Sequence, residues 1–187
     1  MSKENKTRFV ILGLLSHESM TGYDIKKRID STLHYFWSAS YGSIYPSLSE
    51  LEKQELVTKH NQSVEGGRAK IVYEITELGR EQLREWLSSP VEKDELRYET
   101  LLKLFFGKEA GYTRNLQLIE EFMKKYEKEI PVLQGAVGLL SGILEQDETH
   151  LYYMLSAMFG VKIFEAYVAW SKEATKMIKD WEEKHHE

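Results

Sequence analysis

The spacing of hydrophobic positions changes several times in the first 90 residues, and each spacing predicts a different element. Residues 8–16 are nearly all apolar, a pattern that fits either a strand or a buried helix. The residues that follow favour a helix, because Thr21 and Asp24 have the spacing of a capping box. A second helix is therefore expected over residues 22–32.

A third helix is predicted to begin near Ser40 or Tyr41. Ile44, Leu48 and Leu51 recur at the i, i+4 and i+7 spacing of one apolar helix face. The opposite face carries small or polar side chains, which allow a partner to come close: Gly42, Ser43, Pro46, Ser49 and Lys53. This helix therefore has one face for the core and one face for contact with another molecule.

After the third helix the spacing changes to that of two short strands. Residues 56–60 and 70–75 are the predicted strands, and the loop between them carries paired glycines. Ile71, Tyr73 and Ile75 alternate along the second strand, which predicts that all three lie on one side of it.

Thr76 is expected to cap a fourth helix over residues 77–87, with Leu83, Trp86 and Leu87 facing the core. The order helix, helix, helix, strand, loop, strand, helix is that of a winged helix-turn-helix. In this fold the third helix enters the major groove of DNA, and the loop between the strands, the wing, reaches phosphate or the minor groove. The expected fold class is mainly α with a small β-wing.

Apolar residues of the second half repeat in steps of three and four over about four heptads, which predicts a long helix with a continuous seam. A last long helix is expected over residues 149–181. Apolar residues on so many sides exceed what one small monomer can bury, so an antiparallel helical dimerisation domain is expected. The predicted contacts of this homodimer are Leu116, Ile119, Met123, Leu155, Phe159, Ile163, Tyr167 and Trp170.

Charge is distributed unevenly between the two halves. The net charge of −5, taken alone, argues against a polyanion binder. However, residues 1–86 carry 12 Lys and Arg against 12 Asp and Glu, whereas residues 87–187 carry 13 against 18. The polar, proline-containing stretch 88–95 is the expected connector, and the expected domains are residues 1–90 and 91–187. The excess negative charge thus belongs to the half predicted to dimerise.

Several classes of function lack their characteristic residues. The sequence has no cysteine, which excludes disulfides, cysteine-ligated metals and a thiol nucleophile. It also has no phosphate-binding glycine motif or serine-hydrolase motif, and its histidines lack metal-ligand spacing, so no enzyme, cofactor or metal is expected. The absence of a long apolar run and of a secretory signal predicts a cytoplasmic protein without membrane contact.

Ordered segments of the chain resemble the PadR family of bacterial transcriptional regulators. They read ILGLLS, TGYDI, FWSASYGSIYPSLSELE and VYEITELGREQLREWL in the first half. In the second half, RYETLLKLFF at residues 97–106 and AYVAW at residues 166–170 resemble the branch with a long C-terminal domain. That branch includes the phenolic-acid repressor and virulence-activator types. The resemblance implies a homodimeric repressor on a pseudo-palindromic double-stranded DNA operator, released by a small aromatic or amphipathic effector.

The fold and the resemblance together single out a set of DNA contacts on the second helix, the third helix and the wing. Tyr45 has a competing interpretation as a core residue, because it lies about 100° around the helix from Ile44. Thr21 has a competing interpretation as a helix cap alone. No Arg or Gln lies on the outer face of the third helix, which favours readout of shape and phosphate geometry. The predicted contacts are Thr21, Tyr23, Lys26, Ser40, Tyr41, Gly42, Ser43, Tyr45, Ser49, Arg68 and Lys70.

An effector pocket is expected near the junction of the two halves, lined by Trp37, Phe106, Tyr152, Phe159 and Trp170. The alternative is that these aromatic side chains only pack the core and the dimer seam. Two other functions stay open at this point. One is a winged-helix module that binds protein and senses no effector, and the other is a transcriptional activator of the same fold.

Overall fold

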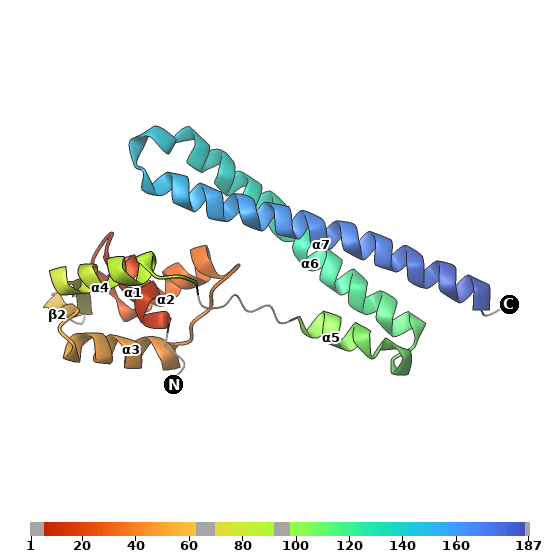
Figure 1. Cartoon of the computed structure of the whole chain (residues 1–187), viewed down its shortest axis with the longest axis horizontal. Helices are drawn as coiled ribbons and strands as arrows, with labels where there is room; N and C mark the ends of the chain where they lie inside the picture. Colours follow the sequence, from red (N-terminus) through yellow and green to blue (C-terminus); the bar gives the residue numbers. More distant parts are fainter. Residues whose placement is uncertain (1–5, 63–69, 92–97, 186–187) are drawn as a thin grey trace. The chain divides into compact units, whose positions relative to one another are not determined.

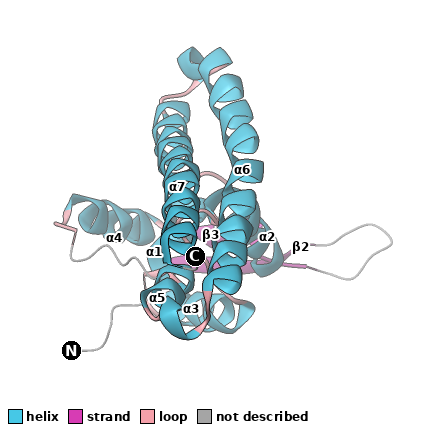
Figure 2. Cartoon of the chain, turned by 90° about the vertical axis from the view of Figure 1, so that its right-hand side faces the viewer, coloured by secondary structure: helices cyan, strands magenta, loops and turns pink. Residues whose placement is uncertain are grey.

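The computed structural model of the protein describes residues 6–62, 70–91 and 98–185. Contacts between Cα atoms divide the chain into two compact units, Met1–Asp94 and Glu95–Glu187, and each is described by itself. Helices dominate both units, and the described strands all belong to the first unit (Figures 1 and 2). This agrees with the predicted class, mainly α with a small sheet.

The first unit places its helices around a three-stranded antiparallel sheet with strand order β1–β3–β2. Strands β2 and β3 form a hairpin, whose described register runs from Val57 opposite Ile75 to Gln62 opposite Lys70. The elements are, in order, α1 (Thr7–Leu15), β1 (Met20–Thr21), α2 (Gly22–Arg28), η1 (Ile29–Leu33), α3 (Tyr41–Lys53), β2 (Val57–Gln62), β3 (Lys70–Ile75) and α4 (Glu77–Ser88). This is the element order of a winged helix-turn-helix with one short additional strand, β1.

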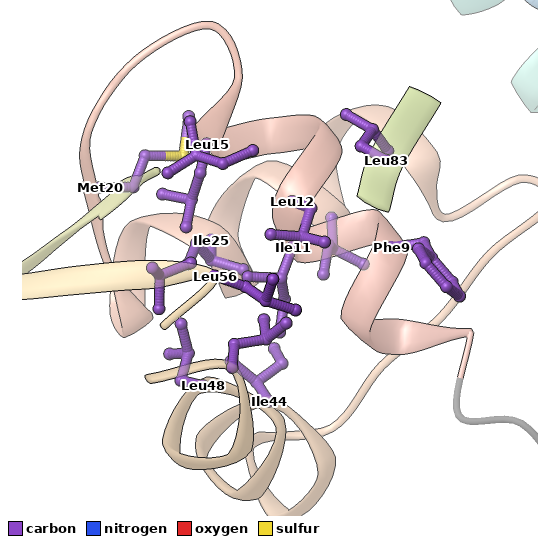
Figure 3. Packing of buried hydrophobic residues seen from close by; sticks show 14 residues of the cluster. Phe9, Ile11, Leu12, Leu15, Met20, Ile25, Ile44, Leu48, Leu56 and Leu83 are labelled. Carbon is purple, nitrogen blue, oxygen red and sulfur yellow. The ribbon is translucent and has the colours of Figure 1, made fainter. Parts of the chain in front are cut away.

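Buried aliphatic side chains from α1, α2 and α3 form the core of this unit (Figure 3). Ile44, Leu48 and Leu51 of α3 are at most 1% exposed, which confirms the predicted apolar stripe. Ile44 and Leu48 point toward the core side chains of α1, among them Ile11 and Leu12 (Figure 3). Because burial of one such side chain contributes roughly 1.5–3 kcal/mol, this packing fixes the orientation of α3.

Two features around α2 differ from the sequence prediction. The helix is α-helical only as far as Arg28 and continues as the wider π-helical turn η1, whereas a uniform helix was expected over residues 22–32. Before it lies β1, which has two residues and is therefore too short to produce an alternating pattern.

The outer end of β3 is more exposed than its inner end. Ile71 is 49% exposed, although on a regular strand it shares a side with Tyr73 and with Ile75, which is 7% exposed. The pairing of β1 with β3 reaches only as far as Val72, which faces Thr21. Ile71 therefore lies beyond the part of the hairpin that the rest of the unit covers.

Helix α4 contacts the core through fewer residues than predicted. Leu83 is buried, and the Trp86 ring stacks on Phe9 of α1 with ring centroids 4.6 Å apart. Leu87 was expected to face inward but is 66% exposed. The helix ends one residue later, at Ser88, so its last turn extends past the surface of α1 that it covers.

The N-terminus of α4 is held tightly against the residues that precede β2. Thr76 caps the helix as predicted, because its Oγ1 accepts a hydrogen bond from the Gly79 amide at 3.1 Å. The same hydroxyl donates to the Glu55 carbonyl at 2.8 Å, and the Thr76 amide donates to the Leu56 carbonyl at 3.0 Å. A Cβ atom at Gly79 would lie only 2.1 Å from the Leu56 carbonyl oxygen. This approach of helix to strand therefore requires glycine.

The second unit is a long hairpin of two helices preceded by a short helix (Figure 1). Its elements are α5 (Glu99–Phe105), η2 (Gly107–Glu109), α6 (Tyr112–Gly142), η3 (Leu144–Gln146) and α7 (Thr149–His185). Pro131 lies inside α6 without ending it. None of the helices in the described residues is long and apolar enough to cross a membrane.

The face that α6 buries against α7 follows the predicted heptad only in part. Ile119, Tyr126 and Leu133 belong to the predicted seam and are buried, but Leu118 and Phe122 lie outside it and are buried as well. The buried positions of α7 are Gly160, Val161, Phe164, Val168 and Ser171. Helix α6 also packs against α5, and the Phe122 ring contacts both Tyr98, which precedes α5, and Trp170 of α7.

Aromatic rings concentrate where the start of α5 meets α6 and α7. The ring of Tyr98, which precedes α5, packs edge-on against Tyr167 at 5.6 Å, and the two hydroxyls share a hydrogen bond. Phe122 contacts Tyr126 at 4.8 Å and Trp170 at 5.8 Å. Burial raises the pKa of both Tyr126 and Tyr167. These rings form the core of the second unit.

A second apolar face of α7 stays exposed. Its members are all at least 51% exposed, in contrast to the buried face of the same helix. We call it the outer stripe of α7, and it consists of Tyr152, Leu155, Phe159, Met177 and Trp181. Exposed apolar surface of this extent is uncommon on soluble monomers and indicates an interaction site.

Candidate nucleic-acid interface

The first turn of α2 is fixed by the predicted capping box. The Asp24 amide donates to Thr21 Oγ1 at 3.1 Å, and the Thr21 hydroxyl donates to Asp24 Oδ2 at 2.7 Å. The hydrogen bond from the Thr21 side chain lowers the pKa of Asp24, and the positive charge of Lys70 lowers it further. The hydroxyl hydrogen of Thr21 is thus already donated to Asp24. A hydrogen bond from Thr21 to phosphate requires this bond to break.

The exposed face of α3 carries two tyrosines one turn apart. Tyr41 is 44% exposed and Tyr45 is 49% exposed, and their rings stack with centroids 6.1 Å apart. The interpretation of Tyr45 as a core residue is therefore wrong. Its ring extends over the surface beside α2, so its hydroxyl can reach a molecule that binds along α3.

Lys26 of α2 completes this aromatic face. Its Nζ lies 5.7 Å from the centre of the Tyr41 ring, within the range of a cation–π interaction. The same nitrogen also pairs with Asp30, one turn further along the chain. Tyr23 is exposed near the start of α2. The predicted contacts Lys26 and Tyr41 are thus brought together by the structure.

The small polar residues at the start and along the exposed face of α3 differ in their hydrogen bonds and exposure. The Ser43 hydroxyl donates back to the Ser40 carbonyl at 2.9 Å, so it satisfies the helix start. Ser40 occupies the N-cap position, but its side chain makes no capping hydrogen bond. Ser40, Gly42 and Ser49 are exposed. This part of the face is polar and has little bulk, which permits close approach of a DNA groove.

The hairpin places a further cation beside the helix-turn-helix. Lys70 is exposed at the start of β3, and its charge acts on Asp24 of α2. Arg68 lies outside the described residues, so its predicted contact stays a prediction. Lys59 of β2, which was not predicted, bonds to Glu52 of α3 at 2.8 Å, and this hydrogen bond raises the pKa of Lys59. The cation of Lys59 is therefore partly neutralised.

Gly22 also contributes to this face, and the sequence prediction omitted it. It is buried beneath the ring of Tyr45. The spacing offers a signal, because Gly22 and Lys26 stand one turn apart, as do Tyr41 and Tyr45. Without the relative position of α2 and α3, that spacing did not show which pairs meet.

The five residues predicted to line an effector pocket lie in different surroundings. Trp37 belongs to the first unit and the other four belong to the second. Phe106 packs edge-on against Phe105, Trp170 contacts Phe122, and the Tyr152 hydroxyl donates to Glu148. Phe159 is largely exposed on the outer stripe of α7. Within each unit, the contacts of the described residues do not gather these side chains around one site.

The predicted dimer residues divide into four groups by burial. Leu155 and Phe159 lie on the exposed outer stripe, and Leu116, Met123 and Ile163 are half-buried. Tyr167 and Trp170 pack in the aromatic core of the second unit. Ile119 is only 1% exposed because its own chain covers it, so it has no surface left to contact a second copy. The prediction of Ile119 as a dimer contact is therefore corrected. The heptad spacing did not separate the apolar positions that the chain buries against itself from those that stay exposed.

The geometry of the first unit defines a winged helix-turn-helix: α2 and α3 form the helix-turn-helix, and the β2–β3 hairpin lies beside it. The sequence profile of the transcriptional regulator PadR-like family matches residues 11–85. The profile of the virulence activator alpha C-terminal domain matches residues 96–179. The chain thus carries a PadR-like family domain followed by a domain of the virulence activator alpha C-terminal type.

Individual relatives support this assignment over nearly the whole chain. The negative transcriptional regulator PadR of Bacillus subtilis is 27% identical over 180 residues, which cover 91% of this chain and 96% of the relative. Its structure in complex with operator DNA has a TM-score of 0.77 at 26% identity, covering 92% of this chain and 98% of that one. Its structure in complex with p-coumaric acid has a TM-score of 0.72, with the same identity and coverage.

A relative with a different regulatory role has a similar fold. The virulence activator AphA of Vibrio cholerae has a TM-score of 0.71 at 26% identity, with 93% of this chain and 98% of that chain covered. The relatives are transcriptional regulators and not enzymes. The fold and the family therefore assign this chain to transcription regulation.

Proposed function

We propose that the protein is a homodimeric, sequence-specific DNA-binding regulator that represses transcription and is released by a small aromatic effector. The observation that carries DNA binding is the exposed face of α3 with its small polar residues and stacked tyrosines. Tyr41 and Tyr45 present hydroxyls there, and Lys26, which is paired with Asp30, lies over the Tyr41 ring. Supporting this, the similar B. subtilis PadR has a structure in complex with operator DNA.

Dimerisation is supported by the outer stripe of α7. Exposed apolar side chains such as Leu155 and Phe159 gain from burial against a second copy. A two-fold dimer carries two copies of α3 and therefore fits a pseudo-palindromic site.

Repression and effector release are supported by the relatives. The similar protein of B. subtilis is a negative regulator, and one of its structures holds p-coumaric acid. A small phenolic compound is therefore the effector class that we propose for this chain. Ligand binding must favour one conformation over another for DNA to be released.

The DNA-binding part is tested with a duplex selected by the wild-type protein from a random library. Tyr41→Ala removes a ring from the proposed face, and its dissociation constant should rise roughly five- to tenfold, the loss of about one polar contact. Leu78→Ala on α4, exposed in the same unit, is the matched control and should bind as the wild type does. Failure to select any sequence, or equal loss in the control, would contradict the proposal.

Dimerisation and effector release need their own measurements. Light scattering should give twice the chain mass for the wild type and a lower mass for Phe159→Glu, because a charge would enter the apolar interface. p-Coumaric acid is then titrated while tryptophan fluorescence and DNA binding are followed together. A fluorescence change with unaltered DNA affinity would remove effector release from the proposal.

Activation is the second candidate, because the C-terminal profile and AphA both belong to virulence activators. The two functions differ in the sign of their effect on a promoter. Deleting the gene should raise transcription from a repressed promoter and lower it from an activated one.

A further inference from the structure

Two residues of α2 meet two residues of α3 in reverse order along the two helices. Gly22 and Lys26 stand one turn apart on α2, and Tyr41 and Tyr45 stand one turn apart on α3. Lys26 lies over the Tyr41 ring, and the Tyr45 ring lies against Gly22. The two rings also stack on each other, so the positions of all four residues are linked.

The contact at Gly22 leaves no space for a side chain. A Cβ atom there would lie 2.7 Å from Cε1, 3.0 Å from Cζ and 3.2 Å from the hydroxyl oxygen of Tyr45. These atoms are the far end of a rotatable side chain and not backbone. An added methyl group would therefore move the ring and leave the helices in place.

The backbone does not require glycine at this position. Among the described glycines only Gly111 has a positive φ, so Gly22 has a conformation that alanine adopts readily. Gly22 is the first residue of α2, so the preference for alanine in a helix interior, about 1 kcal/mol, applies here only in part. The backbone thus does not oppose alanine at position 22, and the side-chain contact with Tyr45 is what opposes it.

We propose that Gly22 is a positioning residue for DNA recognition. Its missing side chain provides the place in which the Tyr45 ring rests, and this fixes where the Tyr45 hydroxyl is presented to DNA. The stack with Tyr41 then transmits any displacement of this ring to the second tyrosine. The inference rests on the proposed function, because it takes the outer face of α3 as the surface that binds DNA.

The test is a double-mutant cycle on Gly22 and Tyr45, measured by fluorescence anisotropy with the duplex selected by the wild-type protein. Gly22→Ala should weaken binding roughly fivefold, the effect of misplacing about one hydrogen bond, and should leave the melting temperature equal or higher. In the Tyr45→Ala background the same change should alter affinity less than about twofold, because no ring is left to displace.

Gly13→Ala in α1 is the matched control. A Cβ atom at Gly13 would meet nothing within 4 Å, so this variant gains helix propensity without displacing a side chain. It should bind the duplex as the wild type does. A loss of affinity in this control would show that a glycine substitution acts through general changes in the unit.

The remaining outcomes of the double-mutant cycle show whether the positioning role of Gly22 or the proposed function itself is wrong. Gly22→Ala with wild-type affinity, or with equal loss in both Tyr45 backgrounds, overturns the positioning role while the proposed function stands. If Tyr45→Ala alone binds normally, the role is also overturned. If Gly22→Ala fails to fold but the double variant folds, the ring contact is supported; if both fail to fold, it is refuted. If the wild type selects no duplex, the proposed function itself fails.

Discussion

Replacing Gly79 with alanine tests how closely α4 must approach the wing hairpin. The new Cβ atom would lie 2.1 Å from the Leu56 carbonyl oxygen, whereas ordinary van der Waals contact begins at 3.4 Å. The Cβ atom is attached rigidly to the backbone and the Leu56 carbonyl oxygen is itself backbone, so no rotation of a side chain relieves the contact. Helix α4 must instead move away from the residues that lead into β2.

The energetic cost follows from the bonds that this movement breaks. Two hydrogen bonds join Thr76 to the carbonyls of Glu55 and Leu56 across this gap, and each contributes about 1 kcal/mol. Repacking around the new methyl group adds about 1–3 kcal/mol, and the higher helix propensity of alanine returns about 1 kcal/mol. Gly79→Ala should therefore destabilise the first unit by about 2–4 kcal/mol.

Thermal unfolding of the full chain, followed by circular dichroism, measures this loss. For a unit of this size, a change of 3 kcal/mol corresponds to a fall of roughly 12 °C or more in melting temperature. Hydrogen exchange of peptides from β2 should accelerate, which assigns the loss to the first unit. Gly13→Ala is the control, and it should be neutral or slightly stabilising. A Gly79→Ala protein within about 1 kcal/mol of the wild type would refute the reasoning.

Three further predictions concern the same unit. Asp24→Asn should destabilise the protein at neutral pH, because the fold lowers the pKa of the Asp24 carboxyl and so favours its charged form. The difference between variant and wild type should vanish at acidic pH, once Asp24 is protonated below the ordinary aspartate pKa of about 3.9. Urea titrations at several pH values measure this difference. Leu48→Ala should cost about 2–5 kcal/mol, since Leu48 is fully buried, and an unchanged denaturation midpoint would contradict its place in the core. Lys70→Ala should lower the slope of log affinity against log salt by about one on the selected duplex, and an unchanged slope would exclude a phosphate contact.

The sequence predicted those features that depend on local spacing. The stripe of Ile44, Leu48 and Leu51 and the cap formed by Thr21 involve neighbours within two turns, so their periodicity was sufficient. Two residues of β1 were too few for a pattern, and the exposure of Leu87 depends on where α4 leaves α1. The orientation of Tyr45 depends on a glycine in another helix, which no spacing within α3 reveals.

In the second half of the chain, the spacing of apolar residues was insufficient for a different reason. The repeated apolar spacing predicted apolar faces on α6 and α7, but it did not show which of them the chain buries against itself. Ile119 of α6 belongs to the core of its own chain, whereas Phe159 of α7 stays exposed on the outer stripe. Composition cannot distinguish the two uses, because buried and interfacial positions draw on the same residue types.

The outer stripe of α7 depends on helical phase. Phe159 and Met177 are separated by 18 positions, which at about 100° per residue amount to five full turns, so both point in the same direction about 27 Å apart. One residue inserted between them would rotate the later part of the stripe by about 100° relative to the earlier part. Relatives that share this surface should therefore vary in sequence along this segment while keeping its length constant.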